Sequence, residues 1–399
     1  MNLFDQAYCE KRLGHSDLRL KNVFIRSAAY EGMLEGGLPR QDLTDHHVAM
    51  AHGSVALTTV SYGAVSADGR TFSTQMYIHE QSLAKLKVLA EKVHRAGGRV
   101  SMQLTHCGYF SKNKDSRPPL APSRVFNAYG FLSGIMFSKA MTEDDMDRVA
   151  HKFAEAASKL KEIGFDAVEI HMGHGYLLSQ FLCPRTNKRR DRYGGSIENR
   201  ARFPLEVLQA VVAMVGRSFP VLVKLNLSDG FRDGFSLADC RYVSKALEEK
   251  GCTAIVLSGG FTSISPFYLM RGSVPLGGMI RNGSSLAEQI TMALFGPFII
   301  KRYRFTPNFF LDQAREIRKY VDLPLVYVGG VDSRGGIEEI LEAGFDFIAI
   351  ARALIHDPDF LIKLSRNLID KSDCNRCNKC VVEMDRGGVK CVLQGPVFG

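Results

Sequence analysis

The sequence lacks any stretch of 18 consecutive apolar residues, which is about the length that a membrane-spanning helix needs. Its first residues, MNLFDQAYCEKRLGHSD, are polar and contain no apolar core of a secretion signal. The 51 Lys and Arg residues produce a formal net charge of +9, yet they form no basic tract. We therefore expect a cytoplasmic protein without a membrane or nucleic-acid partner, whose basic surface favours small anions.

The composition is that of an ordinary folded chain. Hydrophobic residues make up 45% of the 399 residues, with 37 Gly and 14 Pro, so the chain can bury a large core in one α/β domain. Four of the nine cysteines lie between Cys374 and Cys391. This crowding indicates reduced thiols used as ligands rather than the disulfide scaffold of a secreted protein.

Eight short β-branched or apolar runs alternate with longer amphipathic segments. The predicted strands are 22–27, 55–60, 99–104, 167–171, 221–226, 254–259, 325–330 and 347–352. The predicted helices include 82–96, 143–163 and 237–250, which are followed by Gly97, Gly164 and Gly251, where a helix end needs positive φ. The repeat favours a (β/α)8 TIM barrel over the competing open, doubly wound sheet.

Two segments interrupt this repeat. Residues 261–310 follow the sixth strand and are rich in Phe, Gly and Pro. We interpret them as a cover over the active site, although they could equally pack against a second subunit of a homo-oligomer. Residues 371–399 form a short cysteine-rich C-terminal segment. The predicted domains are therefore 1–370 for the barrel and 371–399 for the tail.

Polar side chains gather where the predicted strands end, which is where barrel enzymes carry their chemistry. Gln103 lies near the end of the third strand, and Lys224 lies in the fifth. Because an unpaired buried ammonium is costly, we expect an anionic group to face Lys224. Gly329 and Gly330 end the seventh strand, and Ala351 and Arg352 end the eighth, so backbone N–H groups and a guanidinium could bind a phosphate there.

His171, His174 and Tyr176 follow the fourth strand. The histidines could be packed polar side chains, metal ligands or two donors aimed at a substrate oxygen. A metal site needs a nearby carboxylate, and we expect Glu169 to point to the opposite side of the strand, so we prefer the donors. Tyr176 alone would be a tethered buried aromatic, but its place beside the histidines makes it a candidate acid.

These motifs resemble those of a known family. The run GFDAVEIHMGHGYLLSQFLCPRTNKRRDRYGGSIENRARF (164–203) resembles the strand-four signature of the old yellow enzyme family of NADH:flavin oxidoreductases. Further matches are LKNVFIRSAAYEG (20–32), QLTHCGYFS (103–111), VGGVDS (328–333) and FIAIARALIHDPD (347–359), so the resemblance covers residues 10 to 365. It implies an FMN-binding barrel that passes hydride from NADH or NADPH, through flavin N5, to an activated alkene or a quinone-like acceptor.

The resemblance also implies roles for single residues. His171 and His174 resemble the pair that hydrogen-bonds the carbonyl of the acceptor, and Tyr176 resembles the proton donor to the α-carbon. Gln103 and Lys224 resemble the residues that contact the flavin ring, with the cation near N1 and O2. The remaining implied FMN contacts are Ser27, Ala28 and Ala29 along the ring and Gly329, Gly330, Ala351 and Arg352 at the phosphate. The family often has Thr or Cys where this chain has Tyr30.

Cys374, Cys377, Cys380 and Cys391 could bind zinc or a [4Fe-4S] cluster, because both prefer several thiolates held by short turns. The segment resembles the cluster segment of larger relatives, 2,4-dienoyl-CoA reductase and trimethylamine dehydrogenase. Its cysteine spacing departs from theirs, and we expect no FAD or nicotinamide domain behind it. The alternative is a set of reduced thiols without a metal.

Three other functions stay open. The same flavin could run in the oxidative direction, as a dehydrogenase or demethylase with an external electron carrier. A phosphate-binding TIM-barrel lyase would use Lys224 as a Schiff-base or proton-transfer residue. A non-enzymatic metal or redox sensor would depend on the cysteine tail. We favour the ene-reductase because Gln103, His171, His174, Tyr176 and Arg352 are all present.

Overall fold

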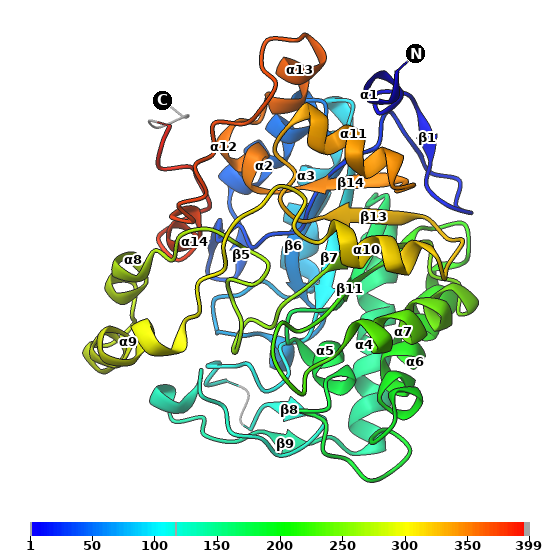
Figure 1. Ribbon diagram of the computed structural model, residues 1–399. Coiled ribbons are helices and arrows are strands. Elements are labelled where there is room, and N and C mark those ends of the chain that lie inside the picture. Colours follow the sequence, from blue (N-terminus) through cyan, green and yellow to red (C-terminus); the bar gives the residue numbers. More distant parts are fainter. Residues whose placement is uncertain (1, 116–117, 395–399) are drawn as a thin grey trace.

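The computed structural model describes residues 2–115 and 118–394. Eight parallel strands close into a barrel, in which neighbouring strands in sequence are also neighbours in space (Figure 1). They are β3 (Phe24–Arg26), β6 (Leu57–Ala64), β7 (Arg99–Thr105), β10 (Ala167–Met172), β11 (Val221–Asn226), β12 (Ala254–Ser258), β13 (Leu325–Val328) and β14 (Phe347–Ile350). Each predicted strand has its counterpart, so the (β/α)8 barrel is confirmed and the open sheet is excluded.

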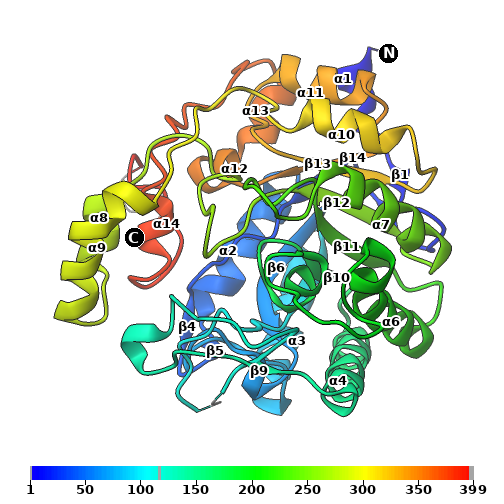
Figure 2. The same cartoon turned by 60° about the horizontal axis from the view of Figure 1, so that its bottom comes forward.

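Helices surround the barrel (Figure 2). They are α2 (Gln41–His52), α3 (Glu80–Arg95), α4 (Glu143–Glu162), α5 (Leu177–Leu182), α6 (Ile197–Val215), α7 (Leu237–Glu249), α10 (Leu311–Arg318), α11 (Arg334–Glu342), α12 (Arg352–His356) and α13 (Phe360–Ser365). Helices α3, α4 and α7 confirm the three predicted from sequence, and the glycine after each has positive φ.

Helix α4 illustrates how the sequence specifies these elements. It begins at a capping box in which Thr142 and Asp145 satisfy each other's backbone N–H groups. Its buried side chains include Met146, Val149 and Phe153, at spacings of three and four residues that place them on one face. That face packs on the barrel, whose strands β10, β11 and β14 are buried along their whole length.

Small elements close the two ends of the barrel. At the N-terminal end lie α1 (Leu3–Gln6) and the antiparallel pair β1 (Lys11–Arg12) and β2 (Arg19–Leu20). At the other end lie β4 (Leu34–Glu35) with β5 (Leu38–Pro39), η1 (Ala67–Gly69), η2 (Phe131–Ser133), and β8 (Leu120–Ala121) with β9 (Lys139–Ala140). Among the described helices, none combines the length and apolarity that crossing a bilayer requires.

The segment 261–310 carries α8 (Leu276–Arg281) and α9 (Leu286–Ile299), which form a helical hairpin beside the barrel (Figures 1 and 2). The tail, with α14 (Cys380–Glu383), packs against it. The side-chain amide of Asn378 donates to the backbone oxygens of Met270 and Ser273, at 2.6 and 2.9 Å, and Asn282 Nδ2 donates to Val382 O at 2.7 Å. The tail therefore braces the segment that we predicted as a cover.

Candidate active site

A cavity of about 690 Å³ opens at the C-terminal ends of the strands. Every residue predicted for acceptor or FMN binding lines it: Ser27, Ala28, Ala29, Gln103, His171, His174, Tyr176, Lys224, Gly329, Gly330, Ala351 and Arg352. Residues of the segment 261–310 line it as well, among them Phe267, Met292 and Phe305, as expected of a cover. The structure thus brings residues from all eight barrel strands, or from directly after them, into one chamber with the cover.

Three polar side chains are buried together in the barrel interior. Glu169 Oε1 accepts a hydrogen bond from Gln103 Nε2 at 2.6 Å and lies 2.9 Å from Lys224 Nζ. Glu169 is therefore the anion that the buried ammonium required. Our expectation that Glu169 points away from His171 was wrong, because residues two apart in a strand share a face. Gln103 still has its carbonyl oxygen and Lys224 has further protons for a ligand.

His171 and His174 lie side by side, with His171 Nε2 3.3 Å from His174 Nδ1. Gly173 N donates to His171 Nδ1, so the proton of this ring belongs on Nε2. His171 Nε2 therefore donates to His174 Nδ1, and His174 Nε2, 2.7 Å from Ser258 Oγ, donates to that hydroxyl. Because the Ser258 hydroxyl can also donate to Nε2, His174 can instead carry its proton on Nδ1. In that tautomer His171 Nε2 and His174 Nδ1 could both donate to one acceptor oxygen.

Burial keeps both imidazoles neutral. It lowers the pKa of His174 to about 3, with the positive charge of Lys224 acting in the same direction. Burial also lowers the pKa of His171 well below its ordinary value, helped by His174 and Lys224. The pair can therefore donate hydrogen bonds to a carbonyl without itself carrying charge at neutral pH.

Tyr176 lies against this pair, with its ring centroid 4.8 Å from that of His171. Its hydroxyl donates to Tyr62 Oη at 2.8 Å, and Tyr30 packs on the other side of Tyr62 at 5.2 Å between centroids. Burial raises the pKa of Tyr176 above its ordinary value, so the hydroxyl keeps its proton. The site therefore holds a phenol proton next to the two imidazole donors.

The opposite end of the cavity is suited to a phosphate. Gly330 has a φ of +83°, and a Cβ there would lie 2.8 Å from the ring of Phe309. Arg352 uses only Nη1 in its two hydrogen bonds, to Arg271 O and Asn378 Oδ1, both at 2.8 Å. Its Nη2 and Nε remain for an anion. Together with the amides around Gly330 and Ala351, they form a set of donors that fits the phosphate of FMN.

The ring end is suited to the flavin. Ser27, Ala28 and Ala29 follow β3 along the wall of the cavity, where the small side chains leave the backbone accessible to a flat ring. Lys224, 1% exposed, supplies a buried cation, and Gln103 supplies an amide. These residues would hold the ring and the phosphate of FMN at the two ends of one chamber, so the donor set fits that cofactor.

The cysteine tail does not form a metal site in the described part of the chain. Within residues 2–115 and 118–394, no three His, Cys, Asp or Glu side chains come together as ligands. Cys374 and Cys380 line the main cavity, Cys377 does not, and Cys391 lies with Sγ 3.2 Å from His356 Nδ1. A zinc or [4Fe-4S] site at these cysteines therefore stays a prediction that the geometry does not support.

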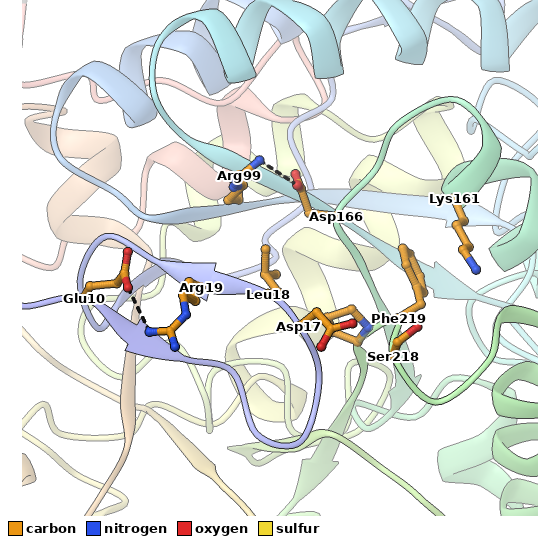
Figure 3. Close-up of a pocket in the computed structure, with 10 residues that line it drawn as sticks. Glu10, Asp17, Leu18, Arg19, Arg99, Lys161, Asp166, Ser218 and Phe219 are labelled. Carbon is orange, nitrogen blue, oxygen red and sulfur yellow. Dashed lines mark hydrogen bonds and ion pairs between the residues drawn. The ribbon is translucent and has the colours of Figure 1, made fainter.

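A second pocket of about 590 Å³ lies at the N-terminal end of the barrel (Figure 3). Four of its charged side chains form two ion pairs: Arg99 Nη1 lies 3.3 Å from Asp166 Oδ1, and Arg19 Nη1 lies 3.0 Å from Glu10 Oε1. Such pairs at this end of a barrel serve stability rather than chemistry.

Sequence reasoning missed two residues of the site. Tyr62 lies beyond residue 60, where the predicted second strand ended, whereas β6 continues to Ala64. Ser258 ends β12 and is a polar residue at a strand end, which is the signal that identified the other candidates. Its contact with His174 depends on how the ends of β10 and β12 lie in the folded barrel, which no local sequence pattern reveals.

The fold and the site define a TIM-barrel protein with a chamber for a phosphate-bearing ring cofactor and a polar clamp beside it. The chain belongs to the NADH:flavin oxidoreductase / NADH oxidase family, whose sequence profile matches residues 13–259. It is therefore an oxidoreductase of the old yellow enzyme type, with FMN and NADH or NADPH as its cofactors. The predicted family and enzyme class are confirmed, and the lyase and non-enzymatic hypotheses are excluded.

Relatives match over most of the chain. A 4,4'-dithiodibutanoate disulfide reductase of Rhodococcus erythropolis is 35% identical over 96% of this chain and 94% of its own length. An NADH oxidase of Thermoanaerobacter brockii is 29% identical over 95% of this chain, which spans only 53% of that relative. The structure of morphinone reductase in complex with tetrahydroNAD superposes with a TM-score of 0.71 at 24% identity, covering 93% of each chain, and so shares the fold.

Proposed function

We propose that this protein reduces activated alkenes or quinone-like acceptors with hydride from NADH or NADPH, a transfer for which bound FMN would supply the chemistry. The main support is that one cavity is lined by His171, His174 and Tyr176 together with Gln103 and Lys224. Two neutral hydrogen-bond donors can polarise the carbonyl of an acceptor. A phenol proton beside them can protonate the neighbouring carbon.

Each residue has a defined task in this proposal. His171 Nε2 and His174 Nδ1 bind the carbonyl oxygen of the acceptor and draw electrons from its double bond. Tyr176 donates its proton to the α-carbon. Lys224 stabilises negative charge at the ring edge, and Glu169 holds Lys224 in place. Arg352 and the amides near Gly330 hold the phosphate.

The replacement Tyr176→Phe tests the proton transfer, with the two half-reactions followed separately under argon. Reduction of bound FMN by NADPH should be nearly unchanged, because no proton from Tyr176 enters that step. Reoxidation by an α,β-unsaturated ketone should slow by about 10²-fold or more. Tyr193→Phe, a buried tyrosine outside the cavity, is the matched control. Equal loss in both half-reactions would remove Tyr176 from the proposed role.

The relative from Rhodococcus erythropolis supports disulfides as a second acceptor class, because that disulfide reductase aligns with this chain from end to end. Hydride would add to one sulfur, the S–S bond would break, and the other sulfur would leave as a thiolate and take a proton from solvent. A thiolate leaves readily near neutral pH and needs no acid. Tyr176→Phe should therefore keep its activity with 4,4'-dithiodibutanoate while it loses activity with the ketone.

The oxidative direction, in which the chain would act as a dehydrogenase or demethylase, needs an electron carrier outside the described residues. It stays a prediction, and so does a homo-oligomeric state. Anaerobic turnover of the ketone with NADPH alone would establish the reductive direction.

A further inference from the structure

Helix α9 exposes an unusually apolar surface. In its sequence, LAEQITMALFGPFI, only Glu288, Gln289 and Thr291 carry polar side chains, and only Gly296 is buried. Phe298 is 88% exposed, Leu286 72%, Ile299 67% and Leu294 60%. Single exposed apolar residues are ordinary, but a continuous group of them on one helix marks an interaction surface. In Figure 2 this helix lies at the side of the molecule with α8 and α14 rather than on the barrel wall.

Apolar side chains of two segments line the active-site cavity. Leu132, in η2, lines it together with Met292, Phe295 and Ile299 of α9. The segment around η2 exposes further large apolar side chains, namely Phe126, Phe131, Met136 and Phe137. Both segments therefore line the cavity and also expose an apolar surface.

Basic residues flank α9 on both sides. Arg281 precedes the helix, Lys301, Arg302 and Arg304 follow it, and all four are exposed. None of the ion pairs among the described residues involves any of them. Between residues 276 and 304 the only acidic side chain is Glu288, which accepts hydrogen bonds from Ser284. Within the described part of the chain, these cations therefore have no ion-pair partner.

We propose that the α8–α9 hairpin and the η2 segment seat this protein on an anionic lipid surface, with the cavity mouth facing the bilayer. The 14 residues of α9 are too few to span a membrane but suit the boundary between headgroups and acyl chains. The flanking cations face the phosphates of the headgroups. A second copy is disfavoured as the occupant, because a two-fold interface would place these cations against themselves.

Lipid binding through the α8–α9 hairpin and the η2 segment does not depend on which acceptor the enzyme reduces. It replaces the expectation of no membrane partner, which rested on the absence of an 18-residue apolar run and so bears only on spanning helices. Apolar acceptors dissolved in the bilayer would enter between α9 and Leu132 without first crossing water.

Flotation of the FMN-loaded enzyme with lipid vesicles tests this docking. The protein should float with vesicles of phosphatidylcholine plus phosphatidylglycerol, much less with phosphatidylcholine alone, and less at high salt. Leu294→Gln and Phe298→Gln should each lower the partition coefficient about tenfold or more. Neither side chain lines the cavity, so turnover of a water-soluble acceptor should not change. Lys301→Gln and Arg302→Gln should each lower binding to anionic vesicles about fivefold.

Leu368→Gln is the matched control, since Leu368 is 67% exposed and lies outside the hairpin and the η2 segment. It should float like the unchanged protein. Failure to float with either vesicle type would overturn the proposal, as would flotation that Leu294→Gln and Phe298→Gln leave unchanged. A dimer in solution that these two replacements dissociate, without vesicle binding, would assign the surface to a second copy instead.

Discussion

Ser258 acts on the proposed acceptor clamp through a single hydrogen bond. Its hydroxyl lies 2.7 Å from His174 Nε2, and when it donates there, His174 carries its proton on Nδ1, where an acceptor oxygen can bind it. Without the hydroxyl, the proton of His174 is free to move to Nε2, and the clamp keeps only the donor of His171.

Ser258→Ala should therefore weaken the binding of phenol-like ligands about fivefold to tenfold, which is the effect of one lost hydrogen bond. Titration of the flavin absorbance with a phenol measures this change. Ser258→Thr keeps a hydroxyl and should restore most of the affinity. Unchanged affinity in the alanine variant would mean that Ser258 does not orient His174.

Site residues could be predicted from the sequence where a local motif contains the reactive side chains. The fourth-strand motif located His171 and Tyr176 because one lies near the end of the strand and the other shortly after it. Glu169 was misplaced because the two-residue period was applied incorrectly, although that period itself predicts its true position. The ion pair of Glu169 with Lys224 joins neighbouring strands at a depth in the barrel that sequence alone does not specify.

Among the elements, the turn between β13 and α11 would form the proposed phosphate end of the site. Gly330 combines a φ of +83° with close approaches to Phe309 and Thr306. The sequence revealed the glycine pair but not these two neighbours, which both belong to the segment 261–310. Sequence patterns predict the path of a long insertion without a repeat less well than that of any other part of a barrel.

Gly330→Ala should strain this turn by about 1–2 kcal/mol and release FMN more readily. The fraction of FMN retained after gel filtration and the dissociation constant from flavin fluorescence both measure the loss. Gly335→Ala is the control, because a Cβ at Gly335 meets no atom within 4 Å and the residue lies in α11. Equal FMN retention in the two variants would contradict the assigned phosphate site.

At the scale of the whole molecule, buried neutral histidines make stability depend on pH. Burial lowers the pKa of His106 to about 4 and of His174 to about 3, and it lowers the pKa of His46, His47 and His171 well below the ordinary value. Below a pH of about 6.5 the unfolded chain binds protons at these positions and the folded chain does not. Their contribution to stability is complete above that pH and is lost as the pH falls toward the folded pKa values.

Two buried carboxyl groups oppose this trend, because burial raises the pKa of Asp229 to about 6 and that of Glu31 to about 7. Because the five histidines outnumber the two carboxyl groups, the unfolded chain still binds more protons than the folded chain in this pH range. The free energy of unfolding should therefore fall between pH 6.5 and pH 4.5, by about 1.4 kcal/mol per pH unit for each net proton. Urea denaturation across this range measures the slope, and a flat profile would contradict the buried, neutral state of the histidines.

The proposed function requires that this barrel hold a flavin that NADPH reduces and an activated alkene reoxidises. The most direct test is the visible spectrum of the protein purified under argon, before and after NADPH and then after an α,β-unsaturated ketone. We predict a band near ~450 nm that bleaches with NADPH and returns with the ketone. A colourless protein, or a band that NADPH leaves unchanged, would contradict the account.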